Sequence, residues 1–215
     1  MTLSEKAKRV LDVLGKEYPN PKIALNFKTP IELLIATILS AQCTDERVNK
    51  TTPALFKKYK KAKDYAEADL KELEGHISSI NFFRNKAKNI QACCKKIENE
   101  FGGEIPDTLE RLITLPGIGR KTANIVLGGA FGKDAIAVDT HVKRVSNRIG
   151  LAFSDNPDKV EEELCKVIPS KRWIKATSLL IHHGRYTCVA KKPKCVICKI
   201  KDYCNYFNGE HSSSL

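Results

Sequence analysis

Four cysteines near the carboxyl end of the chain have a spacing typical of a metal centre. Cys188, Cys195, Cys198 and Cys204 are separated by six, two and five residues. Thiolates are soft ligands that suit an iron–sulfur cluster or zinc. Structural zinc sites usually join two close cysteine pairs through a longer insert, whereas this segment has one close pair between two single cysteines. The spacing favours an iron–sulfur cluster and leaves zinc open.

Basic residues crowd the same segment. Asp202 is the only acid between residues 185 and 204. A run of lysines is often just a solvated surface, but a phosphate-binding loop supported by a metal centre also explains so many cations beside the cysteines. The candidate phosphate ligands are Arg185, Lys191, Lys192 and Lys194.

A glycine-rich turn lies near the middle of the chain. Residues 115–123 read Leu-Pro-Gly-Ile-Gly-Arg-Lys-Thr-Ala and join two segments with helical periodicity. Gly117 and Gly119 permit a tight turn and a close approach of the backbone to a partner. The helix that follows, beginning near Arg120, presents free N–H groups and the positive end of its dipole to an anion. This is the helix-hairpin-helix pattern, which binds DNA phosphates without reading the base sequence.

Lys121 lies in the first turn of that second helix. The neighbouring Arg120 and the helix dipole both disfavour a charged ammonium. A neutral amine is what a lysine needs in order to form a Schiff base. Lys121 is therefore either a covalent nucleophile or a simple phosphate ligand, and this segment is compatible with both roles.

Asp139 follows the apolar run of residues 135–138 and precedes a helical segment. Aspartate is a favoured N-cap, so capping is the simpler interpretation. A cap also fixes the position of the carboxylate, and a fixed carboxylate can stabilise positive charge that develops on a sugar. One residue can serve in both roles.

The net charge of the chain points to a polyanionic partner. The 215 residues include 37 Lys and Arg against 25 Asp and Glu, for a formal charge of +12 and a pI near 9.3. Such an excess favours nucleic acid, with an anionic membrane surface as the second candidate. No stretch approaches the roughly 20 apolar residues of a membrane span. We therefore expect no membrane partner and a cytoplasmic, nucleoid-associated location, where cysteines bind metals or stay buried rather than forming disulfides.

Helical periodicity recurs along the chain, and strand alternation is scarce. Start and stop signals delimit about ten segments in which apolar residues recur at three- and four-residue steps. No βαβ pattern or tandem repeat is visible, so the expected fold class is all-α. The expected helices include residues 7–14, 30–39, 52–56, 87–101, 106–112, 120–130, 139–150, 160–167 and 173–181.

Several motifs in a fixed order establish a resemblance. Residues 33–45 read Leu-Leu-Ile-Ala-Thr-Ile-Leu-Ser-Ala-Gln-Cys-Thr-Asp, residues 138–141 read Val-Asp-Thr-His, and residues 183–188 read His-Gly-Arg-Tyr-Thr-Cys. Together with the glycine-rich turn and the cysteine spacing, they make the chain resemble the endonuclease III family of helix-hairpin-helix DNA glycosylase/AP lyases. The resemblance covers nearly the whole chain.

The resemblance implies two helical domains with a DNA-binding cleft between them. A six-helix barrel domain with the helix-hairpin-helix would span residues 22–133. An iron–sulfur cluster domain would join residues 1–21 to residues 134–211 and would hold a [4Fe–4S] cluster on the four cysteines, mainly as a structural element. We expect a monomer.

The same resemblance assigns roles to single residues. Lys121 corresponds to the catalytic lysine and Asp139 to the catalytic aspartate. Gln42 corresponds to a glutamine that enters the space left by an extruded base. Phe82 corresponds to a wedge residue, although a smaller residue can occur there and Asn81 stands where a glycine is frequent. The alternative for Phe82 is an ordinary core aromatic.

The implied activity is base excision repair of DNA. The chain would remove oxidised pyrimidines such as thymine glycol through a lysine Schiff base and cleave the strand by β-elimination. Its partner would be double-stranded DNA with damaged bases or abasic sites. One alternative is a monofunctional adenine glycosylase, which usually lacks the lysine at position 121 and carries a further recognition domain. Others are a non-catalytic helix-hairpin-helix DNA-binding protein and an electron carrier.

Overall fold

The computed structural model describes residues 1–210, and over that range it contains helices and turns but no strand. This confirms the all-α fold class. The chain divides into two compact units: residues 23–133 form unit 2, and residues 1–22 together with the chain from residue 134 onward form unit 1. The first boundary lies one residue from the expected position. His211, the expected end of the cluster domain, lies outside the described residues.

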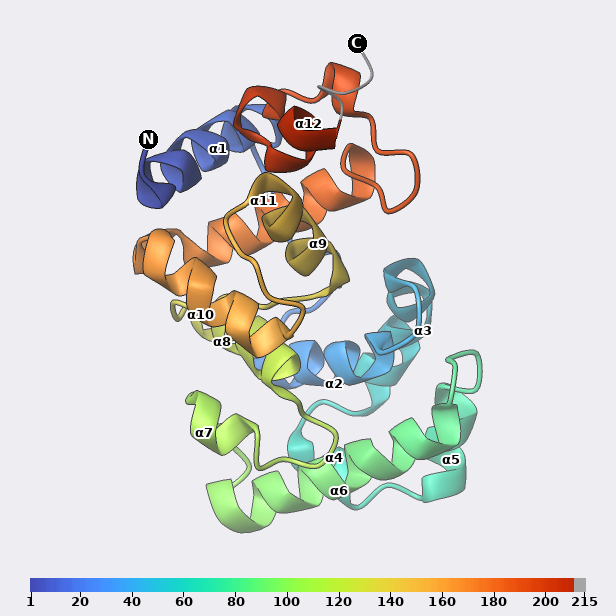
Figure 1. The fold of residues 1–215 in the computed structure, drawn as a ribbon. Coiled ribbons are helices and arrows are strands. Elements are labelled where there is room, and N and C mark those ends of the chain that lie inside the picture. The colour runs from blue at the N-terminus through green and yellow to red at the C-terminus, as the bar shows by residue number, and fades with distance from the viewer. Residues whose placement is uncertain (211–215) are drawn as a thin grey trace. The chain divides into compact units, whose positions relative to one another are not determined.

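Unit 2 is built from seven α-helices, all within residues 23–133 (Figure 1). Two of them, α4 and α7, are only five and four residues long. The seven helices are α2 (Pro30–Ser40), α3 (Asp45–Lys58), α4 (Ala62–Ala66), α5 (Leu70–His76), α6 (Phe83–Phe101), α7 (Leu109–Leu112) and α8 (Arg120–Phe131).

Unit 1 combines the first helix with the carboxyl-terminal half of the described chain. Its α-helices are α1 (Leu3–Glu17), α9 (Thr140–Ile149), α10 (Pro157–Val167), α11 (Trp173–Tyr186) and α12 (Asn205–Glu210). Three single turns of 3₁₀ helix complete it: η1 (Ser170–Arg172), η2 (Cys195–Ile197) and η3 (Lys201–Tyr203).

Some helix boundaries differ from those expected. The start signal at Thr52-Pro53 is wrong: α3 begins at Asp45 with Thr44 as its N-cap, and Pro53 lies inside the helix. The short helices α4, α5 and α12 were not expected, because five to seven residues are too few for an apolar period to show. The helix expected from residue 106 begins only at Leu109, after the Thr108 cap.

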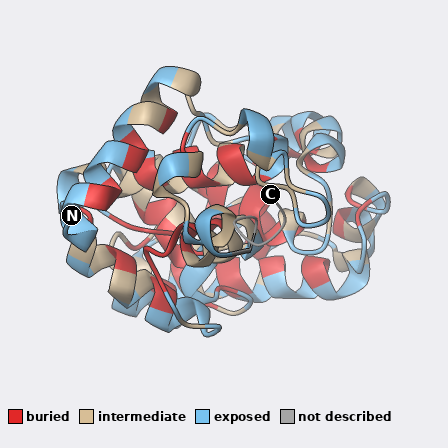
Figure 2. Ribbon diagram, turned by 45° about the horizontal axis from the view of Figure 1, so that its top comes forward, coloured by how far each residue is buried: buried red, intermediate tan, exposed pale blue. Residues whose placement is uncertain are grey.

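The core of unit 2 fixes the direction of its helices. Figure 2 colours the buried residues red. Eight of the eleven residues of α2 are buried, and α2 packs against α8 where Gly129 has no side chain. A Cβ at Gly129 would lie 2.6 Å from Ile23 and 2.7 Å from Leu33. Because Leu33 is near the start of α2 and Gly129 near the end of α8, the start of α2 packs against the end of α8.

A buried lysine joins three helices of unit 1. The Nζ atom of Lys6 in α1 donates to the carbonyl oxygen of Ile149 at 2.6 Å and to Oδ1 of Asn205 at 2.7 Å. Burial lowers the pKa of Lys6. These bonds tie α1 to the carboxyl end of α9 and to α12, which explains why the amino-terminal helix belongs with the second half of the chain.

No helix in the described part of the chain is both long enough and apolar enough to cross a membrane.

Gly150 provides a test of this packing. Its φ is 83°, and a Cβ there would overlap the side-chain amide of Asn205. Gly132 also has a positive φ, 63°, but a Cβ there would meet nothing within 4 Å. We expect Gly132→Ala to cost about 1–2 kcal/mol, the usual cost of left-handed backbone. Gly150→Ala should cost clearly more in denaturant unfolding, and equal losses would contradict the Asn205 contact.

Candidate active site and metal centre

The glycine-rich turn forms the tip of the hairpin between α7 and α8. Gly117 has φ 78°, and a Cβ there would lie 3.2 Å from Cβ of Asn89. Both its backbone and its surroundings therefore require glycine. Gly119 is different, because its φ of −93° suits any residue and a Cβ there would meet nothing within 4 Å. The fold itself does not require glycine at residue 119, so the bare backbone there is available to a partner.

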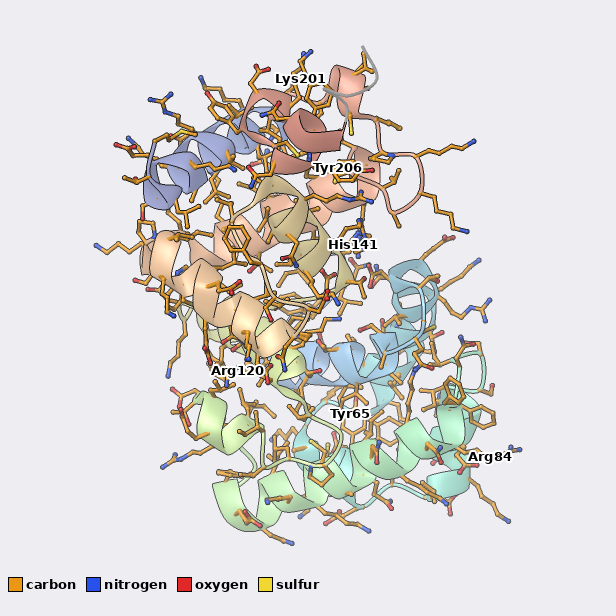
Figure 3. The ribbon with its side chains drawn as sticks, viewed as in Figure 1. Tyr65, Arg84, Arg120, His141, Lys201 and Tyr206 are labelled. Atoms are coloured by element: carbon orange, nitrogen blue, oxygen red, sulfur yellow. The ribbon has the colours of Figure 1, made fainter. Side chains whose placement is uncertain are left out.

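The amino end of α8 is open to an anion. Its N-cap, Gly119, has no side chain to accept from the first N–H groups, and the first turn carries no acid. By contrast, side chains of Thr, Asp or Asn cap α1, α2, α3, α5, α7, α9 and α10. Arg120, labelled in Figure 3, and Lys121 are both exposed at this end. A first turn without a side-chain cap, the helix dipole and two cations together favour a phosphate.

Gln42 and Phe82 are exposed residues with strained backbones. Their φ angles are 53° and 58°, in the left-handed region that non-glycine residues seldom adopt. Phe82 is 63% exposed and precedes α6, so the core-aromatic alternative is wrong. The side-chain amide of Asn81 donates to the carbonyl oxygen of Gln42 at 2.8 Å. This bond brings the two segments together.

Lys192 is the third residue of this kind. Among the residues that the structure describes, only Gln42, Phe82 and Lys192 combine a positive φ with a side chain. All three were predicted to contact DNA. Such conformations cost about 1–3 kcal/mol each and concentrate at functional sites.

Asp139 caps α9. Its Oδ1 atom accepts from the N–H of Val142 at 2.7 Å, which leaves the second carboxylate oxygen outside the cap. The apolar residues 135–138 before it are buried, so the backbone that leads to the carboxylate is anchored. The predicted capping role is present, and the side chain itself is half-buried.

Two arginines of α9 fasten that helix to the cysteine segment. Arg144 Nη2 donates to the carbonyl oxygens of Gly184 at 2.8 Å and Cys188 at 3.0 Å. Arg148 donates to the carbonyl oxygens of Val189 at 2.8 Å and Ala190 at 3.0 Å. The helix that Asp139 caps is thereby fixed to the loop that begins at the first of the four cysteines.

The four cysteines line one pocket in unit 1. Cys188 follows α11, Cys195 and Cys198 bracket η2, and Cys204 follows η3. Burial raises the pKa of the Cys198 thiol to about 11 and also raises that of Cys204, so iron must displace their protons. No three His, Cys, Asp or Glu side chains within residues 1–210 converge on a single ion position. Four soft ligands that line one pocket fit an iron–sulfur cluster.

Two nitrogen atoms lie near sulfurs of this pocket. Arg148 Nη1 lies 3.5 Å from Sγ of Cys188, and Nε2 of His183 lies 3.6 Å from Sγ of Cys198. Burial lowers the pKa of His183 to about 4, so its imidazole is neutral at physiological pH. The Arg148 guanidinium also stacks 4.8 Å from the centre of the Tyr206 ring (Figure 3). Positive charge and N–H groups near the sulfurs suit ligands that become thiolates.

The basic loop stands out from the same pocket. The Lys194 N–H donates to the Thr187 carbonyl oxygen at 3.0 Å and closes the loop between Cys188 and Cys195. The side chains predicted to bind phosphate are all exposed: Arg185, Lys191, Lys192 and Lys194.

The predicted site residues fall into two groups. Gln42, Phe82, the two hairpin glycines, Arg120 and Lys121 lie in unit 2, whereas Asp139, the cysteines and the basic loop lie in unit 1. Sequence reasoning missed the roles of Arg144 and Arg148. Their four-residue spacing on one helix face was the available signal.

Comparison with known proteins identifies the family. A family model described as the HhH-GPD superfamily base excision DNA repair protein matches residues 35–170. Endonuclease III of Synechocystis sp. is 51% identical over 201 residues, which cover 93% of this chain and 92% of that protein. The chain belongs to the endonuclease III family. Endonuclease III of Escherichia coli K12 is 44% identical over 203 residues, 94% of this chain and 96% of that protein.

Solved structures agree with this assignment. A trapped endonuclease III–DNA covalent intermediate matches with a TM-score of 0.91 and 43% identity, covering 98% of this chain and 100% of that one. A non-covalent endonuclease III–DNA complex has the same TM-score and covers 99% of this chain. The chain is therefore a DNA glycosylase/AP lyase of base excision repair whose partner is DNA, not an electron carrier.

The iron–sulfur prediction is also confirmed. A second family model, described as the iron–sulfur binding domain of endonuclease III, matches residues 188–204. This segment begins and ends with the first and last of the four cysteines. The cofactor is accordingly a [4Fe–4S] cluster, and the zinc alternative is set aside.

The hairpin geometry predicts that Gly119→Ala separates DNA binding from folding. A methyl group at residue 119 fits the fold, so unfolding should change by no more than about 1 kcal/mol, the usual range for N-cap substitutions. The same methyl would stand between the backbone and a phosphate, and we expect about tenfold weaker binding to duplex DNA, or about 1.4 kcal/mol. Gly15→Ala in α1, where a Cβ meets only the end of Lys175 at 3.9 Å, is the control. Unchanged DNA affinity of Gly119→Ala would contradict the account.

Proposed function

We propose that the chain removes oxidised pyrimidines, such as thymine glycol, from double-stranded DNA and cleaves the strand at the resulting or pre-existing abasic sites. The observation that carries this proposal is Lys121, an exposed primary amine in the first turn of α8, directly beside the open anion site. A nucleophile placed there lies beside any phosphate that the hairpin holds.

The damaged nucleotide must leave the base stack before its sugar can be attacked. Unpairing costs a few kcal/mol, and less for a damaged base, which contributes to selectivity. Gln42 would enter the vacated space and Phe82 would wedge the neighbouring stack. Their exposure and the bond through Asn81 support this pairing of roles.

The DNA backbone would be bound by two segments, one in each unit. Gly117, Gly119 and Arg120 would bind phosphates at the hairpin, and Arg185, Lys191, Lys192 and Lys194 would bind them at the basic loop. Cys188, Cys195, Cys198 and Cys204 would hold the cluster. When bound, the cluster supplies a rigid structural centre for this loop rather than a reactant.

Covalent catalysis would then begin at the sugar. The lone pair of Lys121 Nζ forms a bond to C1′, the C1′–N bond to the base breaks, and the base departs with the bonding electrons and takes up a proton. The secondary ammonium loses one proton, and the freed lone pair forms a C1′=N bond as the C1′–O4′ bond breaks. O4′ leaves with the bonding electrons and takes up a proton, which gives a protonated Schiff base. Loss of a C2′ proton then expels the 3′ phosphate by β-elimination, and water releases the lysine.

Asp139 would assist at two points. Its carboxylate stabilises the positive charge that develops on the sugar, and it accepts a proton from Lys121. The hydrogen bond from the Val142 N–H holds one carboxylate oxygen of Asp139 and so fixes the side-chain rotamer. The position of the other oxygen is thereby fixed as well.

We further propose that the chain acts as a monomer and associates with the nucleoid, because chromosomal DNA is its substrate.

The nucleophile is tested with Lys121→Gln. This variant should bind abasic duplex with an affinity near that of the parent, since one exposed charge contributes little to an extended phosphate interface. It should form no adduct when mixed with abasic DNA and reduced by borohydride. Full trapping by Lys121→Gln would remove this residue from the mechanism.

Asp139→Asn tests the carboxylate separately from the cap. Asparagine caps helices as well as aspartate does, so the free energy of unfolding should change by less than about 1 kcal/mol. The rate of base excision under single-turnover conditions should fall by about 100-fold or more, in the range of a lost general base. An excision rate close to that of the parent would make Asp139 a cap alone.

A further inference from the structure

Lys86 is a buried cation that the mechanism above does not use. It lies on α6 with 6% of its surface exposed. Its Nζ atom donates to the carbonyl oxygens of Leu39 at 2.8 Å and Ala41 at 2.6 Å, and burial lowers its pKa. Burial of an ammonium is costly unless its donors are satisfied. The Lys86 ammonium therefore depends on these two carbonyl groups at the carboxyl end of α2.

The carboxyl end of α2 needs Lys86 in return. The last turn of α2 carries no basic residue, and its last carbonyl groups have no partner within the helix. Ser40 Oγ donates to the Thr37 carbonyl oxygen, and the Cys43 N–H donates to that of Ser40. Lys86 supplies partners for two more carbonyls and a positive charge at the negative end of the helix dipole.

These contacts adjoin both strained residues. Ala41, one acceptor of Lys86, is the residue before Gln42. On the other side, the Lys86 N–H donates to the carbonyl oxygen of Phe82 at 3.1 Å in the first turn of α6. Asn81, the residue before Phe82, adds a second bond between the two segments: its side-chain amide donates to the Gln42 carbonyl oxygen at 2.8 Å. Lys86 therefore bonds to the residue before Gln42 through its side chain and to Phe82 through its backbone.

A second link lies farther from the tips of these segments. Arg47 Nη1 in α3 donates to the carbonyl oxygen of Ser79 at 3.2 Å, and the hydroxyls of Thr51 and Ser79 are 2.9 Å apart. The segment before Phe82 is thus fixed to the helix that follows Gln42. The segment around Gln42 and the segment around Phe82 are thus bonded through Lys86, through Asn81 and through Ser79. Of these three residues, Lys86 alone is buried.

We propose that Lys86 and Asn81 are positioning residues, a clasp that holds Gln42 and Phe82 at a fixed separation so that the two side chains enter the DNA stack together. The proposal rests on the proposed insertion of Gln42 and Phe82. It adds that their joint placement, and not the presence of either side chain alone, sets the rate of base extrusion. Asn81 and Lys86 touch neither substrate nor reacting atoms in this scheme.

The clasp predicts a separation between extrusion and covalent chemistry. Extrusion from duplex DNA requires both inserted side chains, whereas attack by Lys121 on an abasic site in a single strand requires neither. A loss of fold or of general stability would lower both activities together. The ratio of the two rates therefore distinguishes positioning from a merely structural role.

The test uses Lys86→Met, which keeps most of the side-chain length but removes the ammonium, and Asn81→Ala at an exposed position. Ile97→Ala is the matched control, because Ile97 is fully buried on the same helix but lies about four turns from Phe82. Three quantities are measured on the full chain with its cluster. They are single-turnover excision of thymine glycol from duplex DNA, borohydride trapping on a single-stranded abasic oligonucleotide, and fluorescence of 2-aminopurine beside the lesion, which reports unstacking.

We expect Lys86→Met to slow duplex excision by about tenfold or more, as small misplacements of positioning groups do, and to reduce the 2-aminopurine signal. The borohydride trapping of Lys86→Met on the single strand should stay within about twofold of the parent. A loss of duplex excision without a loss of trapping separates positioning from chemistry. Asn81→Ala should show the same pattern more weakly, and Ile97→Ala should lose stability with both rates retained.

The proposal is overturned if Lys86→Met excises at the parental rate, or if excision and trapping fall by the same factor. If Lys86→Met does not fold, Asn81→Ala decides, and parental excision by that variant overturns the clasp. A parent protein that traps abasic DNA but shows no unstacking would also overturn it. A parent that forms no adduct at all would instead contradict the proposed function.

Discussion

The ends of α2, α8 and α9 leave backbone groups without intrahelical partners, and the way each end is completed accounts for most of the site. At α9 the carboxylate of Asp139 supplies the missing acceptor, which fixes the proposed catalytic carboxylate. At α2 the buried Lys86 supplies the missing donors beside Gln42. At α8 the glycine N-cap supplies no side-chain acceptor, and this is the end that we propose binds a DNA phosphate next to Lys121. Lys86 and Asp139 thus each complete a helix end, whereas the amino end of α8 has no side-chain cap.

In unit 1, the cysteine segment is bonded to the helix that carries Asp139. Arg144 and Arg148 connect α9 to the segment that begins at Cys188, so the helix that carries Asp139 and the loop that carries the basic residues share one support. Lys6 adds the amino-terminal helix to the same support through Ile149. A folded cysteine segment is therefore a condition for the position of Asp139 as well as for the phosphate-binding loop.

The motifs that depend on local chemistry were predictable from the sequence. Cysteine spacing, the hairpin glycines and the Asp139 cap all act within a few residues, and the structure forms the hairpin and the cap as expected. Long-range polar contacts were not predictable in the same way. Lys86 stands four residues before the buried Ile90, on the apolar face of α6, but lysine is seldom buried, so periodicity alone gave no reason to expect a carbonyl partner 47 residues away. The Asn81 bond to Gln42 likewise depends on tertiary packing.

The central claim is that one amine, at the open end of α8, forms the covalent bond to DNA. Peptide mapping of the borohydride-reduced adduct of the unmodified sequence tests it most directly. Trypsin cleaves after Arg120 but not after an alkylated lysine, so the account predicts that the sugar-derived mass lies on the peptide of residues 121–133. An adduct located on the basic loop, for example on Lys191 or Lys192, or on any other lysine, would contradict it.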